Sequence, residues 1–397
     1  KIFEELNAGV WILVALVTWY LLFHKLMTRC CTCRKVRWAA SPSQPFKFPS
    51  YEDQHIWPLR ASHRGGSFEE PENTMRAFEN SVLNHNINFL ECDVHLTRDN
   101  VVIIAHDYDL SRICSLEEED TRKFIGEFTL KELPKLKKAF STGIFEEIQY
   151  QSPLEQEEPA SLCKLEDLFY LCKHDPRFEQ TIVNIDMKKQ PSDLKKTLTG
   201  KDMSDVEVFA TYKLKCDLVH RLITTYEMER RVFWCSPASR EHEFLRSEMF
   251  AEINRCFNAK HMLQVVFMYL IGLTWLLPLK DQHYSSPILT QTTYQRLLVK
   301  RREQGGGSCF TRLMVWLFMK LLQNCQGLYR HLKARGCVIT LWAVNSPEEM
   351  EEVFNLYKDG SSDRSLIDGV MTDFPERLAT FIKAKGKASS GKSRKIN

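Results

Sequence analysis

Apolar and polar positions alternate in two distinct patterns through most of this chain. Short apolar runs, bounded by polar or turn-forming residues, are typical of buried strands, and stretches with helical periodicity separate them. Alternation of strands and helices predicts a parallel sheet with helical crossovers. Strands are expected at Leu59–His63, Asn88–Leu96, Val101–His106, Thr181–Met187, Arg231–Cys235, Cys337–Val344 and Ile367–Thr372.

Two helix starts are marked by capping residues. Asn73 or Thr74 can cap a helix that runs to about Asn84, and Ser346 precedes Pro347 and two acidic residues. Proline in the first turn and acids near the positive end of the helix dipole both favour a helix start. Helices are therefore predicted after each of these caps.

The stretch between His106 and Thr181 is too long for one strand-to-helix connection. It spans roughly 75 residues and carries acidic runs at 117–120 and 155–158. An inserted subdomain or long loop is predicted there, between the third and fourth expected strands.

An uncharged run of 18 residues, Leu6–Phe23, lies near the start of the sequence. As a helix it would be roughly 27 Å long, close to the ~30 Å hydrocarbon core of a bilayer, and basic residues follow it directly. It is predicted to be a transmembrane anchor, followed by a basic, Pro- and Ser-containing linker over 24–55. A cleaved signal peptide is the alternative, but basic residues would then precede the apolar run. By the positive-inside rule, the basic flank predicts that the domain after the linker faces the cytosol.

Two further features concern the membrane and the chain end. Met262–Leu279 is a second uncharged run, accompanied by the apolar patch Leu313–Leu322, and either is expected to be a buried helix or a membrane-associated segment. Residues 386–397, rich in Lys, Ser and Gly, are predicted to form a disordered basic tail.

Charge and cysteine content exclude several classes of protein. The net charge of +3 over 397 residues, without a basic stripe, gives no support to nucleic-acid binding. Thirteen cysteines without paired C-x-x-C motifs argue against a disulfide framework and a structural zinc site. Cys30, Cys31 and Cys33 follow the first apolar run, where they are either palmitoylated or unmodified thiols.

Carboxylates lie on one face of two predicted strands. The period of two places Glu91 and Asp93 together, and it places Asp186 and Lys188 together on the face opposite Val183, Ile185 and Met187. Residues at strand ends meet at the mouth of a parallel barrel. Three acids supplemented by water and phosphoryl oxygens suit one divalent cation, Mg²⁺ or Ca²⁺.

Two histidines stand at the ends of predicted strands, His63 and His106. One imidazole can take the proton of an attacking hydroxyl while the other protonates the leaving alcohol, in either assignment. Arg64 can donate in a planar fork to phosphate oxygens, and the two glycines after it allow close backbone approach. The combination predicts a metal-assisted phosphodiesterase.

Five short motifs follow one another along the chain: H-R-G at His63, E-N-T at Glu72, E-x-D at Glu91, H-D at His106 and an acid-x-K strand at Asp186. Together they resemble the pattern of the glycerophosphodiester phosphodiesterase family. The similarity continues through Trp342–Asn345 and Gly369–Pro375. The resemblance implies a TIM (β/α)8 barrel over 56–385, with the insertion described above and an N-terminal transmembrane helix. The site residues that it implies are His63 and His106 as catalytic acid and base, Glu91, Asp93 and Asp186 as metal ligands, Arg64 and Lys188 as phosphate-directed groups, and Glu72 and Trp342 as residues that support the site and line the substrate cleft.

One position departs from the family pattern. The third metal ligand is usually Glu in this family, whereas Asp186 is shorter by one methylene, so that its reach to the metal would include a water. The Asn-Ile-Asp-x-Lys form and the two apolar runs are similar to the membrane-bound animal branch of the family, whose members act as lysophospholipases D. That similarity implies an integral membrane protein of the endoplasmic reticulum or another endomembrane.

The function predicted from these features is hydrolysis of lysophospholipids to lysophosphatidic acid and the free alcohol. An acyl chain needs an apolar channel near the mouth, and 262–279 with 313–322 could supply it. The alternatives are hydrolysis of water-soluble glycerophosphodiesters to glycerol 3-phosphate and an alcohol, and a membrane lipid-binding barrel without turnover. The expected partners are the substrate and the bilayer, with no nucleic acid and no obligate protein partner.

Overall fold

The chain is described here by a computed structural model. The described residues are 57–117, 121–141, 149–151, 159–188, 204–288, 290–295, 316, 319–320, 323–342, 344–358 and 365–393. The anchor and linker predicted over 6–55 and most of the apolar patch at 313–322 lie outside these residues.

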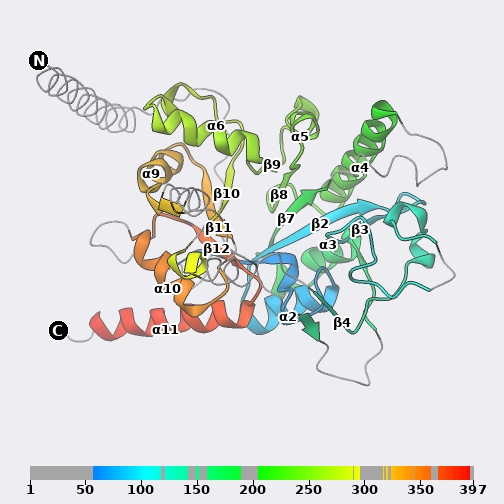
Figure 1. Ribbon diagram of the computed structural model, residues 1–397, viewed down its shortest axis with the longest axis horizontal. Helices are drawn as coiled ribbons and strands as arrows, with labels where there is room; N and C mark the ends of the chain where they lie inside the picture. Colours follow the sequence, from blue (N-terminus) through cyan, green and yellow to red (C-terminus); the bar gives the residue numbers. More distant parts are fainter. Residues whose placement is uncertain are drawn as a thin grey trace, which may run out of the picture.

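Eight parallel strands form a nearly closed barrel (Figure 1). Their order along the sheet is β10-β11-β12-β1-β2-β7-β8-β9, and a parallel bridge between Cys256 and His283 joins the end of β9 to the start of β10. Gly369 permits the close approach of β12 to β1, because a Cβ there would collide with the carbonyl of Leu59. The predicted TIM-barrel-like α/β fold is confirmed. The barrel strands are β1 (Leu59–Ser62), β2 (Phe89–Leu96), β7 (Ile182–Met187), β8 (Val232–Cys235), β9 (Asn254–Arg255), β10 (His283–Pro287), β11 (Val338–Trp342) and β12 (Gly369–Thr372).

The third predicted strand is not part of the barrel. β3 (Val102–Ile104) pairs antiparallel with the end of β2, and β6 (Cys163–Lys164) pairs antiparallel with β3. The insertion therefore lies between the second and third barrel strands, and its expected place between strands 3 and 4 is wrong. A short apolar run does not show whether its strand pairs in parallel or antiparallel. For that reason the sequence alone predicts β3 as a barrel strand. Within the insertion, β4 (Ala139–Ser141) pairs with β5 (Gln149–Gln151).

Helices cover the outside of the barrel (Figure 1). The two predicted caps are confirmed: the Thr74 side chain accepts a hydrogen bond from the Ala77 amide, and Ser346 accepts one from the Glu349 amide. The short strands β9 and β10 contain few apolar residues, so the hydrophobic pattern of the sequence does not predict them. The α-helices are α2 (Met75–His85), α3 (Leu165–His174), α4 (Asp205–Thr225), α5 (Ser239–Leu245), α6 (Ala259–Leu270), α9 (Gln326–Ala334), α10 (Pro347–Leu356) and α11 (Pro375–Ser393).

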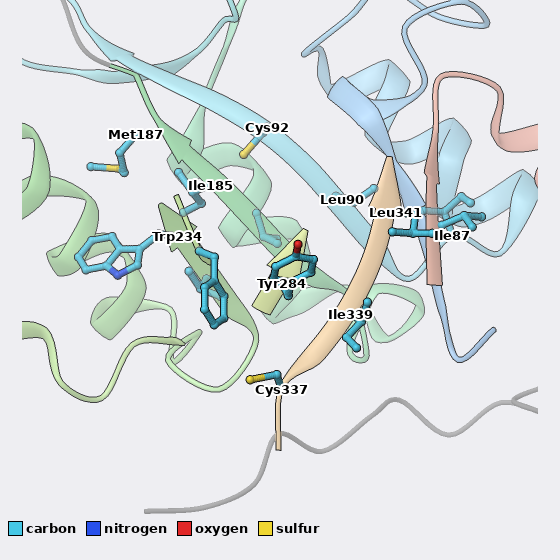
Figure 2. Close-up of a cluster of buried hydrophobic side chains, with 14 of the residues drawn as sticks. Ile87, Leu90, Cys92, Ile185, Met187, Trp234, Tyr284, Cys337, Ile339 and Leu341 are labelled. Carbon is cyan, nitrogen blue, oxygen red and sulfur yellow. The ribbon is translucent and has the colours of Figure 1, made fainter. Parts of the chain in front are cut away.

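Three apolar clusters support this architecture. The largest lies between the outer face of the barrel and the helices, and Figure 2 shows its members Cys92 on β2, Ile185 on β7, Trp234 on β8 and Ile339 on β11. A second cluster fills the insertion, and a third lies within the barrel. The insertion thus has a core of its own.

The predicted membrane segments and the predicted disordered tail can be compared with the helices of the structure. Among the described residues, no helix is both long and apolar enough to cross a membrane. The second apolar run is divided between α6 and a 3-10 turn, Thr274–Leu276. α11 continues to Ser393 and so includes most of the stretch predicted as a disordered tail.

Candidate active site

His63 is positioned by the register of two barrel strands. β1 and β12 pair in parallel with Ser62 opposite Thr372, so the next residues, His63 and Asp373, emerge together at the mouth. His63 Nδ1 lies 2.7 Å from Asp373 Oδ1. Burial alone would lower the pKa of His63, but the Asp373 carboxylate outweighs it, and the net pKa is raised. Asp373 therefore orients the ring and stabilises its protonated form.

The carboxylate of Asp373 is itself held by neutral donors. The Ser67 hydroxyl donates to Oδ1 at 2.8 Å, and the Asn345 amide donates to Oδ2 at 2.8 Å. Burial opposes ionisation of Asp373, but His63 and these donors lower its pKa to about 2. His63 Nδ1 is thus engaged, and its Nε2 faces the site, 4.0 Å from Glu91 Oε2.

His106 is supported within the insertion. It follows β3, and its Nδ1 lies 2.6 Å from Oδ1 of the adjacent Asp107. The other oxygen of Asp107 accepts from Arg112 Nε. Burial opposes ionisation of Asp107, but its contacts with His106 and Arg112 outweigh burial, and its pKa is lowered. Both histidines therefore carry a carboxylate on Nδ1.

Glu91 and Asp93 lie on the same inward face of β2, as predicted, and both are buried. Burial and the negative charge of Asp93 raise the pKa of Glu91. Burial also opposes ionisation of Asp93, but Lys188, His106 and Arg64 outweigh it and lower its pKa. The charge of His106 helps to lower the pKa of Asp93, and His63 lies 4.0 Å from Glu91. Both histidines therefore lie near the same pair of carboxylates.

β7 contributes Asp186 and Lys188 to the same region. Lys188 Nζ lies 3.0 Å from Asp93 Oδ1 and 2.7 Å from Asp186 Oδ2, which joins the two strands as predicted. Burial disfavours the charged ammonium, but the flanking carboxylates raise the pKa of Lys188 above its usual value. The Lys188 ammonium thus bridges two of the predicted metal ligands.

Arg64 and Glu72 meet below the surface of the site. The Arg64 side chain is buried, and its Nη1 donates to Glu72 Oε1 at 3.2 Å. Its backbone amide donates to Glu91 Oε2 at 2.9 Å, from a left-handed conformation with φ 52°. Gly65 continues this turn at φ 79°, where a Cβ would come within 2.8 Å of the Ala77 side chain. Trp342 is exposed at the end of β11.

Four residues with clear contacts in the site were given no role in the sequence analysis: Asp107, Arg112, Asn345 and Asp373. The strand-end argument that selected His63 applies equally to Asp373, which follows β12 directly. Arg112 had no such signal, because only the folded insertion brings its guanidinium 2.6 Å from Glu72 Oε1.

The fit of a divalent cation can be judged from the donors. Glu91 and Asp93 repel each other when both are ionised, and a cation bound between them would reduce that repulsion. The buried Oδ1 of Asn73, whose Nδ2 donates to Asp93, has no hydrogen-bond partner among the described residues. These oxygen donors fit Mg²⁺ or Ca²⁺. In the described part of the chain, only His242, His261 and Asp281 form a trio of His, Cys, Asp or Glu side chains with all ligand atoms within 4.8 Å of one another. Arg246 and Arg255 flank Asp281 there, which opposes a cation.

Residues 63–377 match the model of the glycerophosphoryl diester phosphodiesterase family. The chain belongs to this family. The matched region runs from His63 to the start of α11 and includes every predicted site residue. The family makes the protein a phosphoric diester hydrolase.

Two relatives match over most of their length. The human lysophospholipase D GDPD3 is 26% identical over 338 residues, which cover 83% of this chain and 86% of the relative. The rat lysophospholipase D GDPD1 is 26% identical, with coverage of 81% and 85%.

Solved structures agree with the fold. The glycerophosphoryl diester phosphodiesterase domain of a Mycobacterium tuberculosis protein superposes with a TM-score of 0.50 at 13% identity, covering 81% of this chain and 98% of that domain. A Silicibacter pomeroyi protein assigned to the same enzyme class gives 0.51 at 15% identity, covering 83% and 94%. At these identities the likeness concerns the fold alone.

Proposed function

We propose that this chain is a metal-dependent lysophospholipase D, which hydrolyses lysophospholipids to lysophosphatidic acid and the free alcohol. The observation that carries the proposal is that two histidines, each held by a carboxylate at Nδ1, lie near the same buried pair of acids, Glu91 and Asp93. General acid–base catalysis of phosphodiester cleavage requires two such groups near neutral pH.

In the proposed reaction one histidine removes the proton from a substrate hydroxyl next to the phosphate-bearing carbon. The new O–P bond closes a cyclic phosphate as the bond to the alcohol breaks, and the other histidine protonates the leaving oxygen. Water then opens the ring with the proton transfers reversed. Asp373 and Asp107 hold each imidazole by Nδ1, which leaves Nε2 for these transfers.

The charged groups of the site divide between metal and phosphate. Glu91 and Asp93, with Asp186, are the proposed ligands of one Mg²⁺ or Ca²⁺ ion. Such an ion, when bound, polarises phosphoryl oxygens. Lys188 is proposed to neutralise the phosphate, since its Nζ already lies at the carboxylates of β2 and β7. Arg64 contributes through its backbone amide and its contact with Glu72, and exposed Trp342 is placed to line the cleft.

A lipid substrate is supported by the surface of α6 and the turn that follows it. Leu263, Phe267 and Leu276 are exposed by 67%, 60% and 54%. No Asp, Glu, Lys or Arg occurs between Lys260 and Lys280, so these exposed apolar side chains could enter a lipid surface without burying a formal charge. α6 starts just beyond the carboxyl end of β9, on the side of the barrel where the mouth lies. We infer that this face rests on an endomembrane and that the apolar run 6–23 anchors the chain.

The direct test is product analysis with the full chain purified in detergent. Lysophosphatidylcholine, supplied with Mg²⁺, with Ca²⁺ or with chelator, is expected to yield choline and lysophosphatidic acid only with a cation. His63→Ala and His106→Ala should each lower the rate by about 10²- to 10⁴-fold. His174→Ala, at the exposed end of α3, is the matched control. Equal rates in wild type and His63→Ala would contradict the proposal.

Glycerophosphocholine distinguishes a lipid substrate from a soluble one. The double change Leu263→Glu and Phe267→Glu should slow hydrolysis of lysophosphatidylcholine in vesicles and leave hydrolysis of glycerophosphocholine unchanged. A preference for glycerophosphocholine in the wild type, with no effect of this double change on lysophosphatidylcholine, would favour the soluble-substrate alternative.

A further inference from the structure

A buried lysine stands behind the site, on a helix that has no other part in the proposed reaction. Lys215 lies on α4 and is 5% exposed. Its Nζ donates to the backbone carbonyl of Val94 at 3.3 Å and to the backbone carbonyl of Lys188. One ammonium thus joins the carboxyl ends of β2 and β7.

These two carbonyls are next to the groups that carry the proposed chemistry. Val94 follows Asp93 on β2, and Lys188 is the residue whose side chain bridges Asp93 and Asp186. The β2–β7 register stops at Val94 opposite Met187, so the main chain of Lys188 lies beyond the paired part of the strand. The Lys215 contact fixes the chain at the point where strand pairing ends.

His95, which lines the same cavity as Lys215, makes a similar contact with a main-chain carbonyl. His95 Nε2 lies 3.2 Å from the backbone carbonyl of His106. Burial lowers the pKa of His95 to about 3, so the ring is neutral and donates this proton. Lys215 and His95 line one cavity with Tyr108, Thr211, Tyr212 and Glu241.

We propose that Lys215 is a positioning residue for the phosphodiesterase reaction, which fixes the ends of β2 and β7 and thereby places Asp93 and the Lys188 ammonium at the phosphate. The inference rests on the proposed function. Lys215 touches neither the substrate nor the proposed ion, and it acts through main-chain carbonyls. A buried lysine without a functional demand is costly, because its charge must be desolvated; burial lowers the pKa of Lys215 to about 8.

Chemical rescue tests this role. Lys215→Ala, in the full chain, opens the cavity wall where the ammonium lay, and a small primary amine such as ethylammonium can occupy that space. The variant is expected to lose kcat on the order of 10- to 100-fold, the scale of a misplaced catalytic group, with KM changed less. Ethylammonium should restore part of kcat in a saturable manner. Lys213→Ala is the matched control on the exposed side of α4, and the amine should not affect it.

Hydrogen exchange provides a measurement that does not depend on turnover. In Lys215→Met, whose apolar side chain fills a similar volume, amides of 91–96 and 184–188 should exchange faster, and those of 338–342 on the opposite part of the barrel should not. If Lys215→Ala does not fold, Lys215→Met and Lys215→Gln are compared instead, and Gln, which can donate one hydrogen bond, should be the more active.

The outcomes separate this inference from the function on which it rests. Wild-type protein without phosphodiesterase activity would overturn the proposed function. Active wild type, together with folded Lys215→Met that has wild-type kcat and unchanged exchange, would overturn the role of Lys215 alone. A loss of kcat that amines do not restore, with exchange accelerated over the whole barrel, would also overturn it, because Lys215 would then serve only global stability.

Discussion

The two histidines of the site are supported in opposite ways. His63 lies on the barrel, and its partner Asp373 is 310 positions away in the chain. His106 lies on the insertion, and its partner is the next residue. The first pair is fixed by the register of β1 and β12, and the second by the ion pairs of Arg112 with Asp107 and Glu72.

The proposed catalytic pair is thus assembled from two parts of the fold that are stabilised separately. A strand end within the barrel sheet moves only if the sheet moves, whereas an insertion with its own small core can open separately. The insertion core, which includes Leu110 and Ile113, is distinct from the main cluster. We therefore expect the His106 half of the site to be the more easily perturbed by changes at a distance.

The largest expected effect comes from removing the carboxylate charge beside each histidine. Asp373→Asn should lower kcat by about 10²- to 10³-fold, since Asp373 orients His63 and stabilises its protonated form. Asp107→Asn should have a smaller effect, because Asp107 is 30% exposed and shares its charge with Arg112. Steady-state kinetics on lysophosphatidylcholine would check the order. A greater loss in Asp107→Asn would contradict the comparison.

The same change shifts a pH profile in a defined direction. Asp373 raises the pKa of His63, so in Asp373→Asn the limb of the rate profile due to His63 should move to lower pH. For stability, the pair contributes above the usual Asp pKa of 3.8 and below the usual His pKa of 6.5, and its contribution is lost as pH rises through the raised pKa of His63. The difference in unfolding free energy between wild type and variant should therefore be greatest near pH 5. A difference that grows above pH 7 would be inconsistent with this account.

The ion-pair network of the insertion predicts a smaller loss. Arg112→Met removes the bridge between Asp107 and Glu72 while it keeps much of the side-chain volume, and kcat should fall by about 10-fold. Arg177→Met, which changes an exposed arginine paired with Asp175, is the control and should retain the wild-type rate. Wild-type activity in Arg112→Met would show that His106 needs no support from this network.

The insertion core can be weakened without touching the site. Leu110→Ala deletes a fully buried side chain and should cost about 2–5 kcal/mol of stability within that core. Hydrogen exchange is expected to accelerate over 102–114 and to remain slow over β1 and β12. Acceleration of both regions together would mean that barrel and insertion open as one unit.

The smallest expected effect is on the melting temperature and concerns Glu91, which lies on β2 and 4.0 Å from His63. Burial and Asp93 raise its pKa, so its ionised form is unfavourable in metal-free protein. With chelator at pH 8, Glu91→Gln should melt a few degrees above wild type, because the neutral amide avoids the repulsion. Mg²⁺ or Ca²⁺ should raise the melting temperature of wild type and leave that of Glu91→Gln nearly unchanged. An equal shift in both proteins would place the ion elsewhere.

Periodicity predicted those parts of the site that lie on long, alternating strands. The sequence grouped Glu91 with Asp93 on β2, and Asp186 on β7 with Lys188 directly after that strand, because the period of two needs no knowledge of neighbouring strands. The capped helices α2 and α10 were also predicted, since their signals are local. The sequence therefore identified the residues that a single element positions.

What the sequence did not reveal depends on contacts between distant segments. β3 pairs antiparallel with β2, so the insertion follows the second barrel strand and not the third. The sequence of Val101–His106 does not indicate the direction of this pairing. The role of Arg112 depends on Glu72, which lies 40 positions earlier and meets it only in the folded insertion. The sequence does not distinguish Lys215 from other lysines on an amphipathic helix, because its two carbonyl partners belong to distant parts of the chain.

The most direct test of the account is a double-mutant cycle on the two histidines, measured as the rate of choline release from lysophosphatidylcholine with a saturating divalent cation. If His63 and His106 act as one acid–base pair, the double variant His63→Ala with His106→Ala should be hardly slower than either single variant. Independent losses that multiply in the double variant, or a single variant with the wild-type rate, would contradict the claim that the barrel and the insertion build one catalytic centre.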